Sequence, residues 1–329
     1  MSAGRTLRTA GAGGGQMKAL TITVIILTFH PDDKFRELVR RIHVQTVPPE
    51  RILIINTGEK YFHPEDTADI PEAEVIHISE DEFDHGGTRD LAARMAGTDL
   101  LVFMTQDAVP ADRCLLENMT RGFDDEDTAA VYARQLARRD SSALEKLTRR
   151  YNYGPETVKK TKKDMPQYGV KTFFCSNVCA AYRKDIYDKL GGFDKHTIFN
   201  EDMIFASKLI EHGYAVVYRA DARVFHTHEY TGAQQFHRNF DLGVSQAMHP
   251  EVFASVSSEN EGMTYVKTVI KELFRMRRAC EIPGFIHLCI CKYAGYLLGK
   301  NYRKLPGSMI RICTANESFW NKGADEDVR

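Results

Sequence analysis

The sequence predicts an α/β protein whose mostly parallel sheet is covered by helices on both faces and is followed by a helical C-terminal region. Short apolar runs rich in β-branched residues alternate with amphipathic stretches through the first third of the chain. These runs are almost continuously apolar, which is typical of strands buried on both faces. Strand patterns stop after about residue 250, where helical patterns take over.

Length and composition are those of an ordinary globular protein. The 329 residues suffice for one large or two modest domains, and 43% hydrophobic with 27% charged residues exclude a largely disordered chain. The net charge of −1 argues against nucleic acid as a partner. Seven cysteines without paired zinc-ribbon spacing favour reduced thiols in the cytoplasm. No secretory signal and no apolar run approaching about 18 residues is found, so no segment is expected to span a membrane.

The predicted elements begin at residue 17, because residues 1–16 are expected to be a disordered tag or leader. The β-branched run Thr21–Thr28 predicts the first strand, and apolar residues at helical spacing predict a helix over Asp32–Gln45. The same patterns predict three further strands, at Arg51–Asn56, Glu74–Ser79 and Asp99–Met104, and a helix at Thr88–Ala96.

The middle of the chain is less regular. Residues 138–171 are polar and crowded with lysine and arginine, which predicts an insertion or mobile loop outside the core. Regular structure is expected again in four segments, namely Thr172–Tyr182, a helix over Met203–His212, and short strands at Ala215–Tyr218 and Ala222–Phe225. The expected divisions of the chain are a main domain over residues 17–250, a basic amphipathic helical region over 251–316 and a tail over 317–329.

Polar residues follow three of the predicted strands, where ligands bind in parallel α/β sheets. The three segments are Thr28-Phe29-His30, Asn56-Thr57-Gly58 and Thr105-Gln106-Asp107. The first strand is not followed by GxGxxG, and the chain contains no GxxxxGKS or GxxxxGKT. The dinucleotide-binding and P-loop classes therefore lose their main support.

Acidic residues and histidines supply the candidate chemistry. A lone strand-end carboxylate such as Asp107 is more often a turn or cap residue, and helix capping would equally explain Asp202, which follows Glu201 at a predicted helix start. His226 and His228 point to the same side if they lie on a strand. One of them could then ligate a divalent metal while the other orients a phosphate, although histidines gathered by chance are the alternative.

Several segments taken together resemble the family 2 glycosyltransferases of the Rossmann-like GT-A fold, and most of all the bacterial rhamnosyltransferases. The resemblance covers roughly residues 20–316 and is carried by TVIILTFHP, HGGTRDLAARMA, LLVFMTQDAVP, KTFFCSNVCAAYRKDIYDKLGGFD, NEDMIF and FHTHEY. Two positions depart from the family pattern. Thr105 stands where many members have the first aspartate of Asp-x-Asp, and Asn56 where many have an aspartate.

The resemblance implies an inverting transfer of a sugar, with L-rhamnose from a dTDP-linked donor favoured, to a saccharide or lipid-linked saccharide acceptor in cell-surface polysaccharide synthesis. It implies Mg²⁺ or Mn²⁺ at Asp107 and His226, which would neutralise the diphosphate leaving group. Asp202 is the expected general base, with Glu201 a near-equal rival. The residues expected to contact the donor are Thr28, His30, Asn56, Arg89, Gln106, Asp107 and His228.

Other interpretations stay open. Arg89, beside Gly86 and Gly87, suits a phosphate or sugar hydroxyl at a helix N-terminus, but a tight turn explains the glycines equally well. A UDP-sugar-dependent hexosyl- or N-acetylhexosaminyltransferase of the same fold is an alternative, as is a catalytically silent homologue that binds nucleotide sugars. A nucleotidyltransferase is more distant, since Phe29-His30-Pro31 stands where its glycine-rich basic signature is expected.

The C-terminal helices carry a strong positive charge. Between Thr264 and Ile312 ten lysines and arginines face two glutamates, a net charge of +8 that leaves −9 for the rest of the chain. Aromatic and aliphatic residues are interleaved with these bases, which is typical of a helix that lies on an anionic membrane. We therefore expect a cytoplasmic protein that is peripheral on the inner face of the plasma membrane. A homodimer interface or a helical cap with a solvated face is the alternative.

Overall fold

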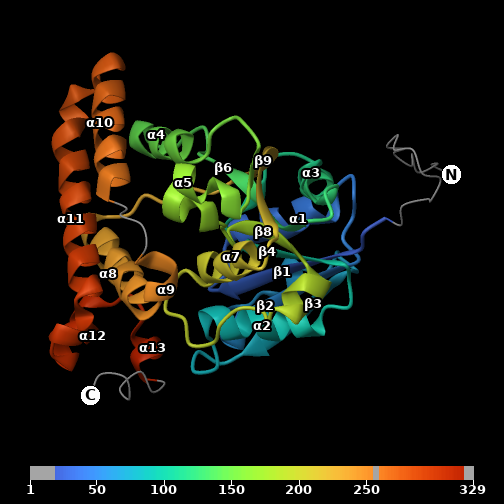
Figure 1. Ribbon diagram of the computed structural model, residues 1–329. Coiled ribbons are helices and arrows are strands. Elements are labelled where there is room, and N and C mark those ends of the chain that lie inside the picture. Colours follow the sequence, from blue (N-terminus) through green and yellow to red (C-terminus); the bar gives the residue numbers. More distant parts are fainter. Residues whose placement is uncertain (1–18, 255–258, 322–329) are drawn as a thin grey trace.

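The computed structural model describes residues 19–254 and 259–321, so the expected leader over residues 1–16 lies outside the described residues. Figure 1 shows a central sheet with helices on both sides and a group of C-terminal helices along one flank. The strands are β1 Ile22–Phe29, β2 Arg51–Thr57, β3 Ala73–Ile78, β4 Leu100–Thr105, β5 Val109–Pro110, β6 Thr128–Leu136, β7 Val158–Lys160, β8 Cys179–Arg183 and β9 Ala215–Phe225. The main-domain helices are α1 Asp33–His43, α2 His85–Met95, α3 Leu115–Thr120, α4 Ala143–Asn152, α5 Met165–Tyr168, α6 Lys184–Lys189 and α7 Glu201–Glu211. The helices that follow are α8 Gly232–Met248, α9 Pro250–Phe253, α10 Glu259–Arg275, α11 Ile282–Lys300, α12 Gly307–Cys313 and α13 Glu317–Asn321.

The strands of the described chain form one mixed sheet in the order β3-β2-β1-β4-β8-β6-β9-β5, with β7 paired to β9. The pairs β1–β2, β2–β3 and β1–β4 are parallel, whereas β8 is antiparallel to both β4 and β6. The α/β class predicted from the sequence is confirmed. The carboxyl ends of β1, β2, β4, β6 and β9 consequently lie at one edge of the sheet, where β8 begins.

Side chains of the central strands enter a separate core on each face of the sheet. Ile25 and Leu53 belong to one core, and Val24 and Ile52 to the other, as expected where successive side chains alternate. Helix α1 covers the second core, with Leu38 fully buried, while α2 and α7 cover the first. Burial on both faces explains why these strands are continuously apolar in the sequence.

Residues 138–171, expected to be an insertion or mobile loop, instead contribute to the core. They include α4, β7 and α5, and both Leu147 and Lys160 are buried. The Lys160 ammonium donates to the carbonyl oxygens of Lys171 at 3.1 Å and Phe174, and burial lowers its pKa to about 7. The prediction is wrong because it counted lysines as a sign of solvent exposure, whereas here backbone carbonyls satisfy a buried one.

Three elements differ in smaller ways from those predicted from the sequence, namely β6, β9 and α2. Strand β6 is not predicted at all. The two short strands predicted at 215–218 and 222–225 are one strand, β9, with an irregular register against β6. Helix α2 begins at His85, earlier than predicted, because the Asp84 side chain caps it by accepting a hydrogen bond from Gly87 N at 2.6 Å. A Cβ at Gly86 would lie 1.9 Å from the Asp194 carbonyl oxygen, so close packing and not a tight turn requires this glycine.

Helices α8 and α11 pack with their backbones in close approach. Gly295 and Gly299 of α11 face α8, where an added Cβ would lie 2.2 Å and 2.0 Å from the carbonyl oxygens of Phe236 and Phe240, respectively. The predicted division at residue 250 therefore separates two helices that pack on each other.

The segment expected to be a tail, residues 317–329, is partly helical. Its first five residues form α13, in which Phe319 and Trp320 are buried. Asp241 of α8 anchors the preceding turn by accepting hydrogen bonds from the Thr314 hydroxyl at 2.6 Å and from Ala315 N at 3.0 Å. The remaining residues, 322–329, lie outside the described part of the chain.

Among the described residues, one helical segment is long enough and apolar enough to cross a membrane, judged by its length and composition alone. It spans Ala279–Lys300, has a mean hydropathy of 1.2 in its most apolar window, and only 17% of that window is buried. No such segment is expected from the sequence, because no uninterrupted apolar run approaches about 18 residues; His287 and Lys292 lie within this helix. The helix packs against α8 along one side, as described above.

The close approach of α8 and α11 predicts the effect of adding one methyl group. Gly299→Ala is expected to lower the free energy of unfolding by about 1–3 kcal/mol, because the new Cβ overlaps a backbone oxygen. Gly284→Ala on the same helix is the control, since a Cβ there meets nothing within 4 Å. It should be neutral or stabilising by up to about 1 kcal/mol. Denaturant unfolding of both variants measures the difference, and equal effects would contradict the close packing.

Candidate active site

Three side chains that could bind a metal ion meet at the carboxyl edge of the sheet. The antiparallel pairing of Val109 with Phe225 places the residue after β4 beside the residues after β9. As a result, Asp107 Oδ2 lies 3.5 Å from His226 Nε2 and 3.1 Å from His228 Nε2. The two Nε2 atoms are 2.8 Å apart. The ligand atoms of the three residues thus all lie within 4.8 Å of one another. We refer to Asp107, His226 and His228 as the metal-binding cluster, after the ligand atoms that they could offer.

Hydrogen bonds around Gln135 determine which nitrogen of His226 faces this cluster. A guanidinium can only donate, so the Gln135 atom bonded to Arg149 is its oxygen, and the amide nitrogen donates to Ser176 Oγ at 3.1 Å. The same oxygen lies 2.9 Å from His226 Nδ1 and accepts its proton. Burial lowers the pKa of His226 to about 3, so the ring is neutral. Its Nε2 lone pair therefore points at Asp107 and His228.

The cluster fits a divalent cation by the chemistry of its donor atoms. Burial opposes ionisation of Asp107, but the hydrogen bond with His228 and the interaction with His226 outweigh it and hold the pKa of Asp107 well below its ordinary value. One carboxylate oxygen and two imidazole nitrogens are a common ligand set for divalent metals. His228, expected to contact the donor, joins His226 here. Thr105 replaces the first aspartate of the usual Asp-x-Asp, and the imidazoles that follow β9 supply ligand atoms in its place.

Glu201 and Asp202 form a second cluster at the start of α7. Asn177 connects them, because its backbone N donates to Asp202 Oδ2 at 2.9 Å and its amide donates to Glu201 Oε1 at 3.2 Å. The Tyr182 hydroxyl in turn donates to the Asn177 side-chain oxygen at 2.9 Å. Arg89 forms an ion pair with Glu201 at 3.2 Å, and both side chains are buried. The expected phosphate ligand Arg89 is thus engaged by a carboxylate.

The environments of the two acids push their pKa values apart. Burial would raise the pKa of Glu201, but the charges of Arg89 and His85 reverse the effect and lower it. Burial and the neighbouring Glu201 charge together raise the pKa of Asp202 to about 7. Asp202 is also the more accessible of the two, being half-buried where Glu201 is buried. A carboxylate with a proton affinity near neutrality is suited to act as a general base.

The other residues expected to contact the donor lie at the ends of β1, β2 and β4. The Thr28 hydroxyl donates to the Asn56 side-chain oxygen at 2.8 Å, and both residues are buried. Gln106 does not join the metal-binding cluster, because its amide bonds to both backbone groups of Phe29, at 2.8 and 3.1 Å. His30 is exposed and stacks on Tyr61 with ring centroids 3.5 Å apart, which makes a flat aromatic surface at the rim.

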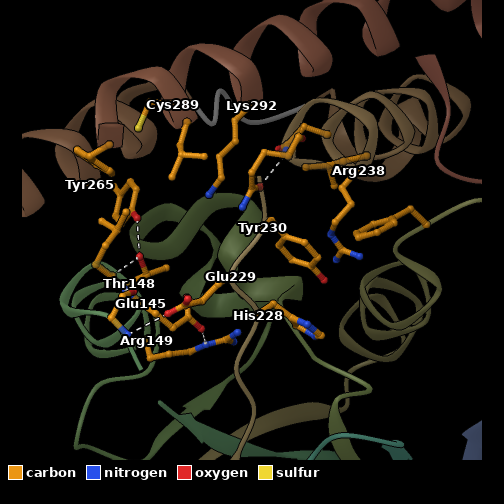
Figure 2. A pocket seen from close by; sticks show the side chains of 18 residues that line it. Glu145, Thr148, Arg149, His228, Glu229, Tyr230, Arg238, Tyr265, Cys289 and Lys292 are labelled. Atoms are coloured by element: carbon orange, nitrogen blue, oxygen red, sulfur yellow. Dashed lines mark hydrogen bonds and ion pairs between the residues drawn. The ribbon is translucent and has the colours of Figure 1, made fainter. Parts of the chain in front are cut away.

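A cavity of about 400 Å³ adjoins the metal-binding cluster, and His228 belongs to both. Figure 2 shows it between α11 at the top and the segment with His228 and Tyr230 below, with Lys292 reaching in from α11. Sequence reasoning missed Gln135 and Lys292. Gln135 lies on the unpredicted strand β6, and no local motif marks Lys292 among ten basic residues of its region.

Comparisons with known proteins identify the family. The model of glycosyl transferase family 2 matches residues 23–191. The chain is 36% identical over 304 residues to the O-antigen chain rhamnosyltransferase RfbN of Salmonella typhimurium, covering 92% of this chain and 96% of that protein. It is 37% identical over 307 residues, with the same coverage, to the O-antigen chain rhamnosyltransferase WbaN of Salmonella anatum.

A solved structure shows the same fold. The mannosyltransferase PcManGT of Pyrobaculum calidifontis, described in complex with GDP-Man and Mn²⁺, superimposes with a TM-score of 0.54 at 17% identity. The match covers 93% of this chain and 89% of that one. The resemblance identified in the sequence is confirmed, and the chain belongs to glycosyltransferase family 2.

Proposed function

We propose that this glycosyltransferase transfers L-rhamnose from a dTDP-linked donor, with inversion, to a saccharide or lipid-linked saccharide acceptor in cell-surface polysaccharide synthesis. The observation that carries the proposal is the 36–37% sequence identity, over 92% of the chain, with two O-antigen chain rhamnosyltransferases. The metal-binding cluster and the buried acid pair support catalytic competence and argue against a silent homologue. A UDP-sugar donor is the alternative that the same fold would accept.

In the proposed mechanism Asp202 takes the proton of the acceptor hydroxyl as this oxygen attacks the anomeric carbon. Inversion requires the base on the side opposite the leaving diphosphate. Asp202 is the less buried of the two acids, and its pKa is about 7. Glu201 is committed to Arg89 and Asn177. These contacts favour Asp202 as the base and give Glu201 the role of positioning Asn177 and Arg89.

The residues Asp107, His226 and His228 would hold the divalent cation that neutralises the diphosphate leaving group. Two imidazole ligands favour Mn²⁺ over Mg²⁺, because Mg²⁺ prefers oxygen ligands while Mn²⁺ accepts both. The Mn²⁺ in the complex of the Pyrobaculum mannosyltransferase is consistent with this choice.

A panel of donors tests the proposed activity. Nucleoside diphosphate release from dTDP-L-rhamnose, UDP-glucose and UDP-N-acetylglucosamine should be fastest with dTDP-L-rhamnose. EDTA should abolish it, and Mn²⁺ should restore it better than Mg²⁺. Asp107→Ala should abolish turnover and weaken nucleotide binding, because the diphosphate loses its counter-charge. Full activity of the EDTA-stripped enzyme would contradict the metal role, and preference for a UDP-sugar would favour the alternative donor.

If Asp202 is the general base, its substitution should lower activity but raise stability at alkaline pH. Asp202→Asn should lower kcat by roughly 10²–10⁴-fold with donor affinity retained. In wild-type enzyme kcat/KM should rise with pH through about 7, as Asp202 loses its proton. Because this pKa is raised above the unfolded value of about 3.9, ionisation of Asp202 destabilises the fold progressively as the pH rises from there to about 7. The asparagine variant should therefore unfold at a higher temperature than wild type at pH 8.

Glu201→Gln is the matched control for this pair. It should lower the melting temperature, because it leaves the buried Arg89 guanidinium without its carboxylate. If Glu201→Gln folded normally but lost turnover while Asp202→Asn stayed active, the two roles would be exchanged.

We further propose that α10, α11 and α12 dock the enzyme on the inner face of the plasma membrane. Eight of the ten basic side chains between residues 264 and 312 are exposed, which supports attraction to anionic lipid. Exposed apolar side chains accompany them. Ile290, Tyr293 and Leu297 are 61%, 55% and 40% exposed and share one face of α11 by their spacing. Such a face is suited to insert shallowly into the lipid interface.

Liposome co-sedimentation tests the docking. Binding should require anionic lipid at low salt, since each basic residue near the surface contributes about 1 kcal/mol. Binding should weaken but persist at about 1 M salt, where the Debye length is only about 3 Å. Ile290→Ser with Tyr293→Ser should remove the salt-resistant part, whereas Leu91→Ser, at a 47% exposed position on α2, should not. Equal binding to neutral and anionic vesicles, or none to either, would contradict the docking. The C-terminal helices would then be better explained as a dimer interface or a structural cap.

A further inference from the structure

The cavity between the main domain and the C-terminal helices is lined mostly by residues that have no role in the proposed mechanism. Its walls come from α4, α8, α10, α11 and the segment after β9. His228 joins it to the metal-binding cluster, with its Nε2 near Asp107 and its ring stacked on Tyr230 at a centroid distance of 4.9 Å. A molecule in this cavity would therefore lie next to the site proposed for the donor diphosphate.

Lys292 brings a positive charge into this cavity. It follows Phe285, Leu288 and Cys289 at helical spacing on the cavity-lining side of α11, and Figure 2 shows its side chain pointing inward. Within the described residues, its ammonium has neither an ion pair nor a hydrogen bond. Burial lowers its pKa, which shows that the charged form is poorly solvated there. Lys292 is half-buried, and a poorly solvated cation without a partner is costly unless an anion binds it.

Arg238 supplies a second cation without a carboxylate partner among the described residues. Its guanidinium lies over the rings of Tyr230 and Phe199, at 4.9 and 5.3 Å from their centroids. The acids that line the cavity have other partners. Glu145 binds Arg149 at 2.7 Å, and Glu229 accepts a hydrogen bond from the backbone N of Ser142 at 3.0 Å. Two cations therefore remain available to an anionic ligand, which multiply charged phosphate groups satisfy best.

We infer that this cavity binds the diphosphate of a prenyl-linked saccharide acceptor, with Lys292 as the main ligand of the phosphate oxygens. The inference rests on the proposed function, because it takes the molecule beside the donor site to be the acceptor. A lipid source of the phosphate is favoured because the same helix, α11, lines the cavity on one side and exposes Ile290, Tyr293 and Leu297 on another. The apolar side chains of Leu242, Phe285 and Leu288 also line the cavity and would contact the first prenyl unit.

Calorimetric titration in EDTA tests the inference without requiring catalysis or a bound metal. The probes are geranyl diphosphate, inorganic pyrophosphate and geraniol. Wild-type enzyme should bind geranyl diphosphate more tightly than pyrophosphate, and geraniol most weakly. Lys292→Gln should weaken geranyl diphosphate binding roughly 10- to 100-fold, the usual worth of a hydrogen bond to a charged group. Lys292→Arg should restore most of it. Lys271→Gln, at an exposed lysine of α10, is the matched control and should bind like wild type.

Further measurements separate this inference from the proposed function. Lys292→Gln should keep the wild-type melting temperature and the wild-type affinity for dTDP in the presence of Mn²⁺, which shows an intact fold and donor site. Unchanged geranyl diphosphate binding in Lys292→Gln would overturn the inference even if rhamnose transfer is found. Equal affinity for pyrophosphate and geranyl diphosphate would overturn the lipid source. Weaker geranyl diphosphate binding in Lys292→Gln, but not in Lys271→Gln, would support the inference whichever sugar the donor panel identifies.

Discussion

The hydrogen bond between Gln135 and His226 is the contact on which the arrangement of the metal-binding cluster depends. It holds the Nδ1 proton of His226 away from Asp107, so the Nε2 lone pair is available on the side where His228 also lies. Gln135 is itself fixed by Arg149 and Ser176. Because Ser176 precedes Asn177, which binds both acids of α7, one chain of short contacts joins the cluster to the acid pair. Polar groups of β6, of α4 and of the segment before β8 therefore fix the positions of the two halves of the site relative to each other.

The acid pair shows how one helix start can hold two carboxylates in different states. Glu201 has a guanidinium and an amide as partners, so it is stable as an anion despite its burial. Asp202 accepts hydrogen bonds from two backbone N–H groups, but its burial and the charge of Glu201 raise its pKa to about 7. The burial and the neighbouring charge that make Asp202 a useful base also make its ionised form costly to the fold. Reactivity and local instability have one physical origin here.

Strands β1 to β4 and the polar residues after them could be predicted from the sequence, because they depend on local periodicity. His226 and His228 are expected to share a side only if they lie on a strand, but both follow the end of β9. Asp107, His226 and His228 each appear in a recognisable motif, although only the register of β5 on β9 brings them together. Residues 138–171 are misjudged because charge count is a poor guide where backbone carbonyls solvate a buried lysine. Gln135 and Lys292 could not be predicted, since their importance comes from contacts with distant elements.

Helix α11 connects three surfaces of different chemistry through its periodicity alone. Gly295 and Gly299 let one side of α11 approach the α8 backbone closely, which holds the helix against α8. The first half of the helix lines the cavity beside His228, and Ile290, Tyr293 and Leu297 form an exposed apolar face. A rigid helix keeps the distance between its faces constant. An amphiphilic molecule whose apolar part contacts the exposed side would thus present its polar part at a fixed height relative to the metal-binding cluster. If the cavity holds the acceptor diphosphate as proposed, this constraint would let the enzyme select acceptors by where their phosphate lies.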